Sequence, residues 1–469
     1  MLERCVIVFD VGKTNAKLTL WDGSGRQLER RVRANDVIRA GYRALDVAGI
    51  EEWLANTLAD YARRADIGAI VPVGHGAAAA LVYEGRLFAA PMDYEQDVDP
   101  TERARYTAQR DEFAETGSPL LPHGLNLGLQ LHWLEQLTSA WHEDLRILLW
   151  PQYWSWRLCG VMASETSSLG CHTDLWNPLA HRFSSLAQRR GWAARMPALR
   201  RAGEVLGTLT PEWIARTGLP RNCSVLCGLH DSNAALLAAR GHGEIRDHDA
   251  TVLSTGTWFV AMRSPSSRGQ VNPGALDEHR DCLINVDVAG SPVPSSRFMG
   301  GREAELIGDI DIHALTANYE PQRLIDRLPL LLQSGAAALP TFARGSGPFP
   351  RAAGEWRNKP ARADDQRAIT GLYLALLADA SLQLIDSRER LLIEGRFAEA
   401  VIFVRALAAL RPQQKVFVCN AHEDVPYGAL RLLDPALAPA APLRAVEPLD
   451  VDFSAYASEW REHAARSAA

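Results

Sequence analysis

Alternating apolar positions predict a strand, a polar turn and a second strand at the start of the chain. Cys5 to Phe9 is a short apolar run rich in β-branched residues, and Lys17 to Trp21 alternates polar with apolar residues. Asp22 and Gly23 form a hairpin signal, so Gln27 to Val32 is expected to return as the partner strand. The residues between the first two strands make a short polar turn that contains glycine.

Helical periodicity follows these strands. Apolar residues between Ile50 and Tyr61 recur at helical spacing, and Ile67 to Val73 reads as a further strand. Antiparallel strands followed by alternating helices and strands indicate an α/β layer structure.

The second half of the chain repeats this opening. Thr251 to Ser254 and Trp258 to Met262 predict two strands around a turn rich in threonine and glycine, and Gln366 to Asp386 predicts a long helix. We therefore interpret the chain as two related lobes, residues 1–242 and 243–469. The boundary lies in a polar stretch where no apolar period survives.

Length and composition narrow the function classes. A chain of 469 residues is too long for one hydrophobic core. Its net charge of -6 gives no basic field, so a nucleic-acid partner is not expected. Seven scattered cysteines do not suggest a disulfide framework, and no apolar run is long enough to span a bilayer. With no signal-peptide pattern at the start, these features predict a cytoplasmic protein without a membrane partner.

The polar turn from Asp10 to Lys17 is the first candidate for chemistry. Such a turn presents successive backbone N–H groups, and its glycine lets a ligand approach the backbone closely. Thr14 and Asn15 add side-chain donors, while Lys13 and Lys17 add positive charge, so the turn suits a polyphosphate. It matches neither the P-loop nor the dinucleotide fingerprint. Taken alone, a turn of this kind is more often an ordinary β-hairpin.

Two later segments favour the phosphate interpretation. Ser254 to Trp258 repeats a threonine-bearing turn, and two such turns on two lobes can hold a phosphate chain from opposite sides. Asp231 follows a predicted strand at Cys223 to Cys227 and precedes a predicted helix. Aspartate at a helix start is a common N-cap. A carboxylate there can also accept a proton from a substrate hydroxyl, as in kinase catalysis.

Together these motifs resemble those of the FGGY carbohydrate kinases, in the actin/hexokinase/Hsp70 superfamily. Asp10 to Lys17, with its D-x-G-x-x-N-x-K pattern, resembles the first phosphate motif, and Ser254 to Trp258 resembles the second. Gly228 to Asp231 resembles the catalytic segment. The resemblance covers nearly the whole chain. It implies an α/β fold of two actin-like (ribonuclease H-like) lobes, each a mixed five-stranded sheet flanked by helices, with an active-site cleft between them.

The resemblance also implies a role for each motif. Asp231 is the general base, and Asp10 organises Mg2+ through water, with Asp231 as the second metal candidate. The implied phosphate contacts are Gly12, Lys13, Thr14, Asn15, Lys17, Thr255, Gly256 and Thr257. ATP and Mg2+ are accordingly the expected cofactors, and a small-molecule sugar is the expected partner.

The match is looser where the family carries its adenosine motif. Arg396 follows Gly395 at a place where the family usually has a second glycine, and Ala400 lies about where it often has asparagine. Gly395 and Arg396 are the nucleotide candidates of this segment. Arg396 can stack on adenine or contact phosphate, or it is a surface residue.

Other segments resemble the sugar-contact regions of related kinases. The substrate candidates are His75, Gly76, Asp93, Tyr94, Gln152 and His230, together with Asp231. The segment from Pro91 to Glu95 lacks the arginine that the family usually has there.

The surroundings of Asp231 and of the second turn look closest to the L-fuculose and L-rhamnulose kinases. We therefore expect a 6-deoxy-ketohexose phosphorylated at O1. The alternatives are a kinase of another ketose or polyol (xylulose, ribulose or glycerol type), a non-catalytic sugar- or nucleotide-binding relative, and an ATPase or chaperone-like relative. A homodimer is an open prediction, because the oligomeric state cannot be derived from these patterns.

Overall fold

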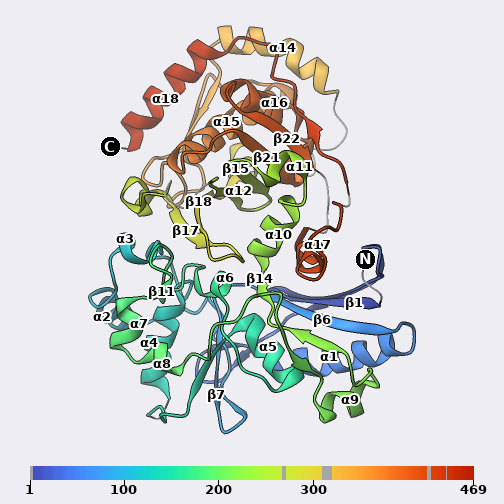
Figure 1. The fold of residues 1–469 in the computed structure, drawn as a ribbon. Helices are drawn as coiled ribbons and strands as arrows, with labels where there is room; N and C mark the ends of the chain where they lie inside the picture. Colours follow the sequence, from blue (N-terminus) through green and yellow to red (C-terminus); the bar gives the residue numbers. More distant parts are fainter. Residues whose placement is uncertain are drawn as a thin grey trace. The chain divides into compact units, whose positions relative to one another are not determined.

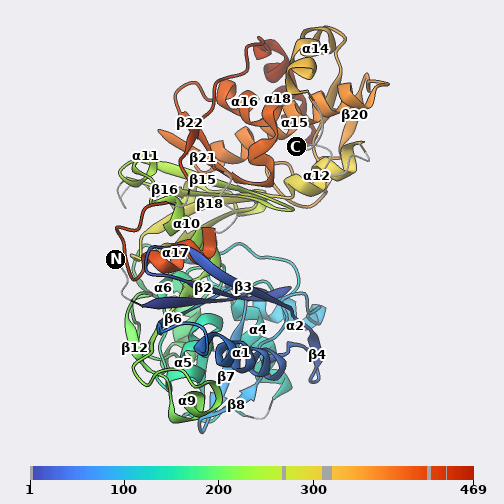
Figure 2. The same cartoon turned by 90° about the vertical axis from the view of Figure 1, so that its right-hand side faces the viewer.

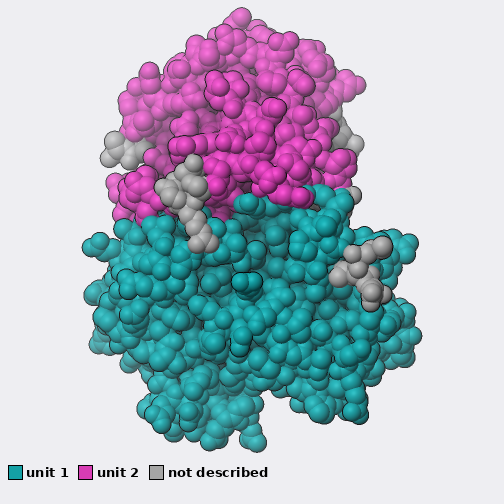
Figure 3. All heavy atoms as spheres, in the orientation of Figure 1, with its two compact units in different colours: residues 1–241, 284–292, 423–440 teal, residues 242–283, 293–422, 441–469 magenta. Residues whose placement is uncertain are grey.

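The chain folds into two compact units (Figure 3). The computed structural model describes residues 4–138, 140–266, 271–308, 320–419, 424–439 and 441–468. Unit 1 comprises residues 1–241, 284–292 and 423–440, and unit 2 comprises residues 242–283, 293–422 and 441–469. The first division falls within one residue of the lobe boundary expected at 242. Two later segments nevertheless belong to unit 1, so the units are not continuous in sequence as the two expected lobes are.

Unit 1 alternates strands and helices along the chain (Figure 1). Its strands are β1 Cys5–Val11, β2 Asn15–Trp21, β3 Gln27–Ala34, β4 Val37–Arg39, β5 Arg43–Leu45, β6 Ile67–Gly74, β7 Ala79–Tyr83, β8 Arg86–Ala89, β9 Arg146–Leu149, β10 Trp176–Asn177, β11 Arg182–Phe183, β12 Val205–Thr208, β13 Ser224–Leu226 and β14 Leu229–His230. Its helices are α1 Val47–Ala62, α2 Pro100–Thr107, α3 Phe113–Thr116, α4 Leu127–Leu137, α5 Trp150–Cys159, α6 Thr166–Leu169, α7 Ser185–Arg189, α8 Trp192–Arg195, α9 Pro211–Thr217, α10 Asp231–Ala239 and α17 Asp424–Arg431.

A seven-stranded sheet forms the centre of unit 1, in the order β12-β13-β6-β1-β2-β3, with β14 pairing with β6 beside this path. Strand β1 pairs antiparallel with β2 and parallel with β6, so the sheet is mixed. Because successive side chains of a strand point to opposite faces, Ile7 and Phe9 pack with α1 and α5, whereas Val6 and Val8 pack with α10 and α17. Figure 2 shows α1 on one face of this sheet and α10 with α17 on the other.

Close packing between α10 and α17 explains why residues 423–440 belong to unit 1. A Cβ atom at Gly428 of α17 would lie 1.7 Å from the carbonyl oxygen of Ala234 in α10. Only glycine permits this approach of one helix to another. The same face of the sheet is thereby covered by residues from two distant parts of the chain.

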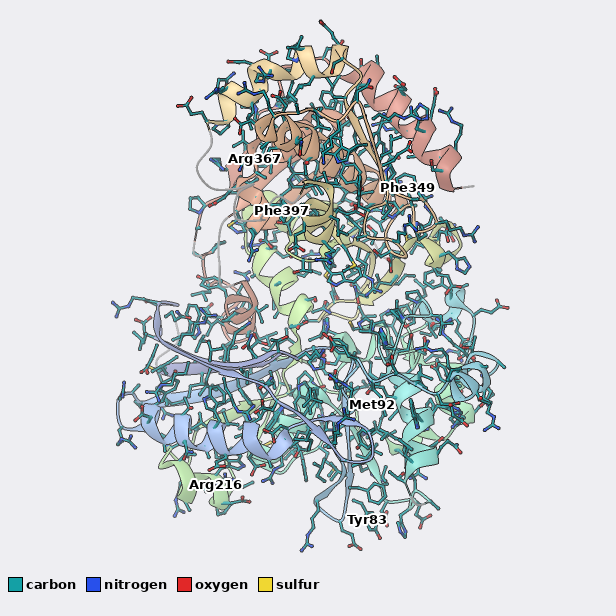
Figure 4. The ribbon with its side chains drawn as sticks, turned by 180° about the vertical axis from the view of Figure 1, so that it is seen from behind. Tyr83, Met92, Arg216, Phe349, Arg367 and Phe397 are labelled. Atoms are coloured by element: carbon teal, nitrogen blue, oxygen red, sulfur yellow. The ribbon has the colours of Figure 1, made fainter. Side chains whose placement is uncertain are left out.

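A third hydrophobic cluster of unit 1 surrounds the small sheet β8-β7-β9. Leu81, Leu129 and Ile147 belong to it, and so does Met92, which is fully buried and labelled in Figure 4. Met92 forms an antiparallel bridge with Ala44. This bridge fixes the backbone just before Asp93 and Tyr94.

Unit 2 contains most of the elements after residue 242. Its strands are β15 Ala250–Thr255, β16 Phe259–Ser264, β17 Cys282–Val286, β18 Pro292–Phe298, β19 Ala337–Leu339, β20 Glu355–Arg357, β21 Arg390–Gly395, β22 Lys415–Cys419 and β23 Arg444–Ala445, of which β17 and β18 extend across the division. Its helices are α11 Gly243–Arg246, α12 Gly300–Gly308, α14 Pro321–Gln333, α15 Ala363–Leu384, α16 Val401–Leu410 and α18 Ser454–Ala468, with short 3-10 helices η2 Pro273–Ala275, η3 Glu278–Arg280 and η4 Arg396–Glu399. None of the helices in the described ranges is long and apolar enough to cross a membrane.

The sheet of unit 2 also has seven strands, in the order β17-β18-β16-β15-β21-β22-β23. Strand β15 pairs antiparallel with β16 and parallel with β21. Leu253, Phe259 and Ile393 from these strands pack into one core with α15 and α16.

The two sheets repeat one strand order. The path β12-β13-β6-β1-β2-β3 corresponds to β23-β22-β21-β15-β16-β18, with the same parallel and antiparallel pairs. The expected mixed sheet in each half is confirmed, but each sheet has seven strands instead of five. Two added strands, β14 and β23, have two residues each, which is too short for an alternating apolar pattern.

Candidate active site

The turn between β1 and β2 brings a carboxylate and an ammonium group together at the end of the sheet. Asp10 lies opposite Lys17 in the strand register, and Lys17 Nζ donates to Asp10 Oδ2 over 3.0 Å. The Gly12 N–H donates to the Asn15 carbonyl over 3.0 Å, which closes the turn and leaves Thr14 exposed at its tip. The predicted hairpin therefore forms, and it exposes Thr14 at its end.

Asp231 occupies the first position of α10. Its Oδ1 accepts a hydrogen bond from the N–H of the adjacent Ser232 over 2.6 Å. Within the described ranges no N–H of α10 beyond that of Ser232 donates to this carboxylate, so Asp231 does not cap the helix in the usual way. His230 Nε2 lies 3.2 Å from Asp231 Oδ1. The carboxylate keeps its second oxygen available.

The two carboxylates Asp10 and Asp231 titrate abnormally. Burial raises the pKa of Asp10; the Lys17 ammonium opposes this rise, and the charge of Asp231 adds to it. Burial also raises the pKa of Asp231, although 31% of its side-chain surface is exposed. A carboxylate that is reachable and has a raised pKa is a better proton acceptor than an ordinary surface aspartate.

A network behind Asp231 holds the preceding residue. The His230 N–H donates to Ser167 Oγ over 3.2 Å, and that hydroxyl donates to Glu165 Oε2 over 2.7 Å. His230 Nε2 lies 3.1 Å from Cys171 Sγ. Burial lowers the pKa of His230 to about 4, so its ring is neutral at pH 7. Neither Glu165 nor Cys171 belongs to the site residues predicted from the sequence. The sequence does carry a signal for Glu165, namely a glutamate followed by a run of small polar residues. In the structure the Glu165 carboxylate caps α6.

Gly76 provides space for this network. A Cβ atom there would lie 2.7 Å from Cys171 Sγ and 3.0 Å from His230 Cδ2. Gly76 therefore allows His230 to pack close to the end of β6, and its role in the described structure is steric.

His75 follows β6 and is the most unusual polar residue of the region. Its side chain is buried, and neither ring nitrogen has a hydrogen-bond partner in the described part of the chain. Burial lowers its pKa to about 4. The His75 ring meets the Tyr94 ring edge to face, with centroids 5.5 Å apart. A buried donor and acceptor without partners favour a polar ligand at this place.

Asp93 is fully buried and already paired. Its Oδ1 accepts from the Glu95 N–H over 3.0 Å, and Arg43 Nη2 donates to its Oδ2 over 2.9 Å. A guanidinium therefore lies beside this segment, although the segment itself carries no arginine. We call Asp93, Tyr94 and Glu95, which lie in a segment predicted to contact the sugar, the sugar-side wall. The contacts of Asp93 shape its backbone.

Gln152, in α5, contacts the segment that leads to Asp231. Its Nε2 donates to the carbonyls of Cys227 and Gly228, each over 3.2 Å, while its buried Oε1 has no partner within the described ranges. Gly228 has a φ of 80°, and a Cβ atom there would lie 2.2 Å from the Pro72 carbonyl oxygen. Glycine is thus required at the turn that leads to Asp231.

In unit 2 the two threonines of the turn between β15 and β16 differ in their contacts. Thr255 Oγ1 donates to the Glu394 carbonyl over 2.5 Å and accepts from the Phe397 N–H over 3.0 Å. The Gly256 N–H donates to the Trp258 carbonyl over 3.1 Å, which closes the turn. Thr257 is exposed at its tip, so Thr257 and not Thr255 presents a free hydroxyl.

Gly395 is the last residue of β21, opposite Thr255 of this turn, and Arg396 follows it. Gly395 has a φ of 83°, and a Cβ atom there would lie 2.3 Å from the Thr255 carbonyl oxygen. Arg396 is exposed and has no ion pair or hydrogen bond among the described residues. Phe397, labelled in Figure 4, packs in the core of unit 2. The backbone of this segment is close-packed, and the Arg396 guanidinium is free to contact a ligand.

Mg2+ fits the carboxylates of unit 1 on chemical grounds. No group of three or more potential metal ligands occurs in the residues the structure describes. Mg2+ usually keeps several waters and is bound through one or two carboxylates plus substrate phosphates. Asp10 and Asp231, whose raised pKa values would fall beside a cation, match that requirement.

Comparisons with known proteins agree with this geometry. The family described as carbohydrate kinase FGGY, C-terminal domain, matches residues 247–441. The crystal structure of a carbohydrate kinase from Novosphingobium aromaticivorans has 50% sequence identity, covers 98% of this chain and 100% of its own, and superimposes with a TM-score of 0.93. The chain belongs to the FGGY carbohydrate kinase family. As a member, it is a sugar kinase, a phosphotransferase with an alcohol group as acceptor.

More distant FGGY kinases share the fold. The xylulose kinase from Rhodospirillum rubrum has 17% identity and a TM-score of 0.76 and covers 99% of this chain and 98% of its own. The Plasmodium falciparum glycerol kinase with ADP has 11% identity and a TM-score of 0.79, with the same coverage. No curated protein matches the chain. The predicted family and its two-lobed α/β fold are confirmed; the cleft between the lobes stays a prediction.

Proposed function

We propose that this FGGY kinase transfers the γ-phosphoryl group of ATP to a hydroxyl of a small neutral ketose, with Asp231 as the general base. The observation that carries the proposal is the Asp231 carboxylate itself. It is reachable, its pKa is raised by burial, and it is not used to cap α10. Unpartnered ring nitrogens of His75 lie in the same unit, and its ring contacts Tyr94.

In the proposed reaction Asp231 accepts the proton of the sugar hydroxyl as that oxygen bonds to the γ-phosphorus. The bond from the γ-phosphorus to the bridging oxygen breaks, and ADP leaves. Asp10 and Asp231 would hold Mg2+, which neutralises phosphate charge when bound. Thr14 and the backbone of the β1–β2 turn, with Thr257 and Gly256 of unit 2, would bind phosphates.

A neutral sugar is supported by the charges near His75 and Tyr94. Lys13 and Arg43 are the cations beside this wall, and each forms an ion pair with Asp93 and with Glu95. A sugar acid would therefore meet no unpaired cation in this part of the described structure. Within the neutral sugars we propose a 6-deoxy-ketohexose such as L-fuculose or L-rhamnulose, phosphorylated at O1.

A coupled ADP-release assay over a ketose and polyol panel tests the proposal. L-Fuculose, L-rhamnulose, xylulose, ribulose and glycerol are each measured with Mg-ATP, and gluconate serves as the anionic comparison. We expect turnover that depends on a neutral ketose. Hydrolysis of ATP without sugar would favour an ATPase, and sugar binding by thermal shift without turnover would favour a non-catalytic relative.

Location and assembly complete the proposal. Seven scattered cysteines do not form the pattern of a disulfide framework, which supports a reducing compartment, and we propose the cytoplasm. The homodimer is tested by light scattering at two protein concentrations, where a mass near 51.5 kDa indicates the monomer.

A further inference from the structure

Lys13 lies in the β1–β2 turn, yet its contacts point to a different segment. Its side chain is 15% exposed, and its Nζ lies 3.6 Å from Asp93 Oδ1. The same ammonium forms an ion pair with Glu95 and stands 4.8 Å from the centroid of the Tyr94 ring. Three successive residues of the sugar-side wall thus surround one ammonium group.

We infer that Lys13 is a positioning residue for the sugar and not a phosphate ligand. It acts by holding the Tyr94 ring against His75. This inference rests on the proposed function and deepens it. The charge of an ammonium shared by two carboxylates and an aromatic face is largely balanced and attracts a phosphate weakly. Lys17, which pairs with Asp10 alone among the described residues, is better placed for that role.

The backbone of the wall does not depend on Lys13. Met92 bridges Ala44, the Asp93 N–H donates to the Arg43 carbonyl over 2.9 Å, and the Arg43 guanidinium pairs with Asp93. Among the described residues, Lys13 is the one that places a cation over the Tyr94 ring, and it also contributes to the charge balance. A cation over an aromatic ring is attracted by the ring face, and more strongly when the pair is shielded from water.

Loss of this contact should affect sugar binding selectively. In Lys13→Met the Tyr94 ring loses its cation, and Asp93 with Glu95 exceeds Arg43 by one negative charge. We expect the KM for sugar to rise roughly tenfold, which corresponds to about 1.4 kcal/mol. The KM for ATP and kcat should change less than about twofold, because the phosphate-binding backbone of the turn remains.

Steady-state kinetics with sugar and ATP varied separately test the inference. Lys13→Arg, which keeps the cation, should restore most of the sugar affinity. Lys415→Met removes an exposed lysine at the start of β22 and is the matched control, with both KM values unchanged. Combining Lys13→Met with Glu95→Gln rebalances the charge, so the double variant should raise the sugar KM less than the product of the single effects.

The opposite pattern in the two KM values overturns the inference. A large rise in the KM for ATP with an unchanged sugar KM would make Lys13 a phosphate ligand, and the sugar-kinase proposal would still stand. If Lys13→Met does not fold, Glu95→Gln decides: a raised sugar KM alone supports the inference, and an unchanged one refutes it. Wild-type protein without sugar-dependent ADP release would refute the proposed function, and this inference with it.

Discussion

The β1–β2 turn of unit 1 and the β15–β16 turn of unit 2 have the same architecture and different chemistry. In each, a glycine N–H closes the turn, at Gly12 and Gly256, and an exposed threonine occupies the tip. Each first strand runs parallel to a strand that ends in glycine: Val11 lies opposite Gly74, and Thr255 lies opposite Gly395. The two turns are therefore equivalent in topology.

The two turns differ in the charged residues that they carry. One residue before the strand end stands Asp10 in unit 1 and Ser254 in unit 2. The first turn carries Lys13 and Lys17 and lies with a second carboxylate, Asp231, within electrostatic range of Asp10. The second turn has no charged side chain of its own. In the proposed function, the repeated framework binds phosphate twice with backbone groups, while the proton transfer and the metal site belong to the copy in unit 1.

The largest expected effect is at Asp231, the proposed general base. Asp231→Asn removes the proton acceptor and should lower kcat roughly 1000-fold, because general-base catalysis contributes about 10²- to 10⁴-fold. The melting temperature should stay near that of the wild type, since Asn can accept the Ser232 hydrogen bond. Asp36→Asn, at an exposed carboxylate, is the control. Unchanged turnover in Asp231→Asn would show that another group takes the proton.

The next effect compares the equivalent positions Asp10 and Ser254. Asp10→Asn should lower activity roughly 10- to 100-fold, as expected when a residue that orients metal water is removed. The concentration of Mg2+ needed for half-maximal activity should rise as well. Ser254→Ala should leave both quantities nearly unchanged. Equal losses in the two variants would contradict the asymmetry between the turns.

The threonines separate ligand contact from structure. Thr14→Val and Thr257→Val should each raise the KM for ATP roughly tenfold, because each removes a donor available to a charged phosphate. Thr255→Val should instead leave the Phe397 N–H unsatisfied and destabilise the fold by about 1–3 kcal/mol. Thermal melting and ATP kinetics on the three variants distinguish these roles. A changed ATP KM in folded Thr255→Val would return Thr255 to the phosphate contacts.

Sequence patterns anticipated the parts of the fold that depend on local alternation. Both hairpins, α1 and α15 follow from periodicity, and the repeated strand-turn-strand opening predicted the repeated sheet. The transfer of residues 423–440 to unit 1 was missed, because it depends on a steric contact between Gly428 and Ala234 that no local pattern encodes.

The sequence predicted candidate residues for the site, but it did not predict the contacts that these residues make. Motif resemblance selected Asp231 and His75, and burial in the fold gives both of them shifted pKa values. It could not assign Lys13, whose position in the turn suggests phosphate while its contacts lie on the sugar-side wall. Side-chain direction at a turn is set by tertiary neighbours, and Thr255 illustrates the same limit.

The smallest effect concerns pH, and it also belongs to unit 1. His75 and His230 have pKa values lowered by burial to about 4, whereas an unfolded histidine has about 6.5. The unfolded chain therefore binds protons first, so stability present above pH 6.5 is lost as the pH falls toward 4. At pH 5 the loss is about 2 kcal/mol per histidine.

The carboxylates change stability in the opposite direction, so the histidine effect must be isolated by difference. Raised pKa values of Asp10, Asp231 and Glu165 favour the folded state as the pH falls. Chemical denaturation of the wild type and of His75→Gln at pH 7 and pH 5 removes this shared contribution. The variant should lose less stability between the two pH values, by about 2 kcal/mol, because glutamine does not titrate. Equal losses would mean that His75 is solvated in the free enzyme, and the argument that its ring awaits a sugar hydroxyl would then fail.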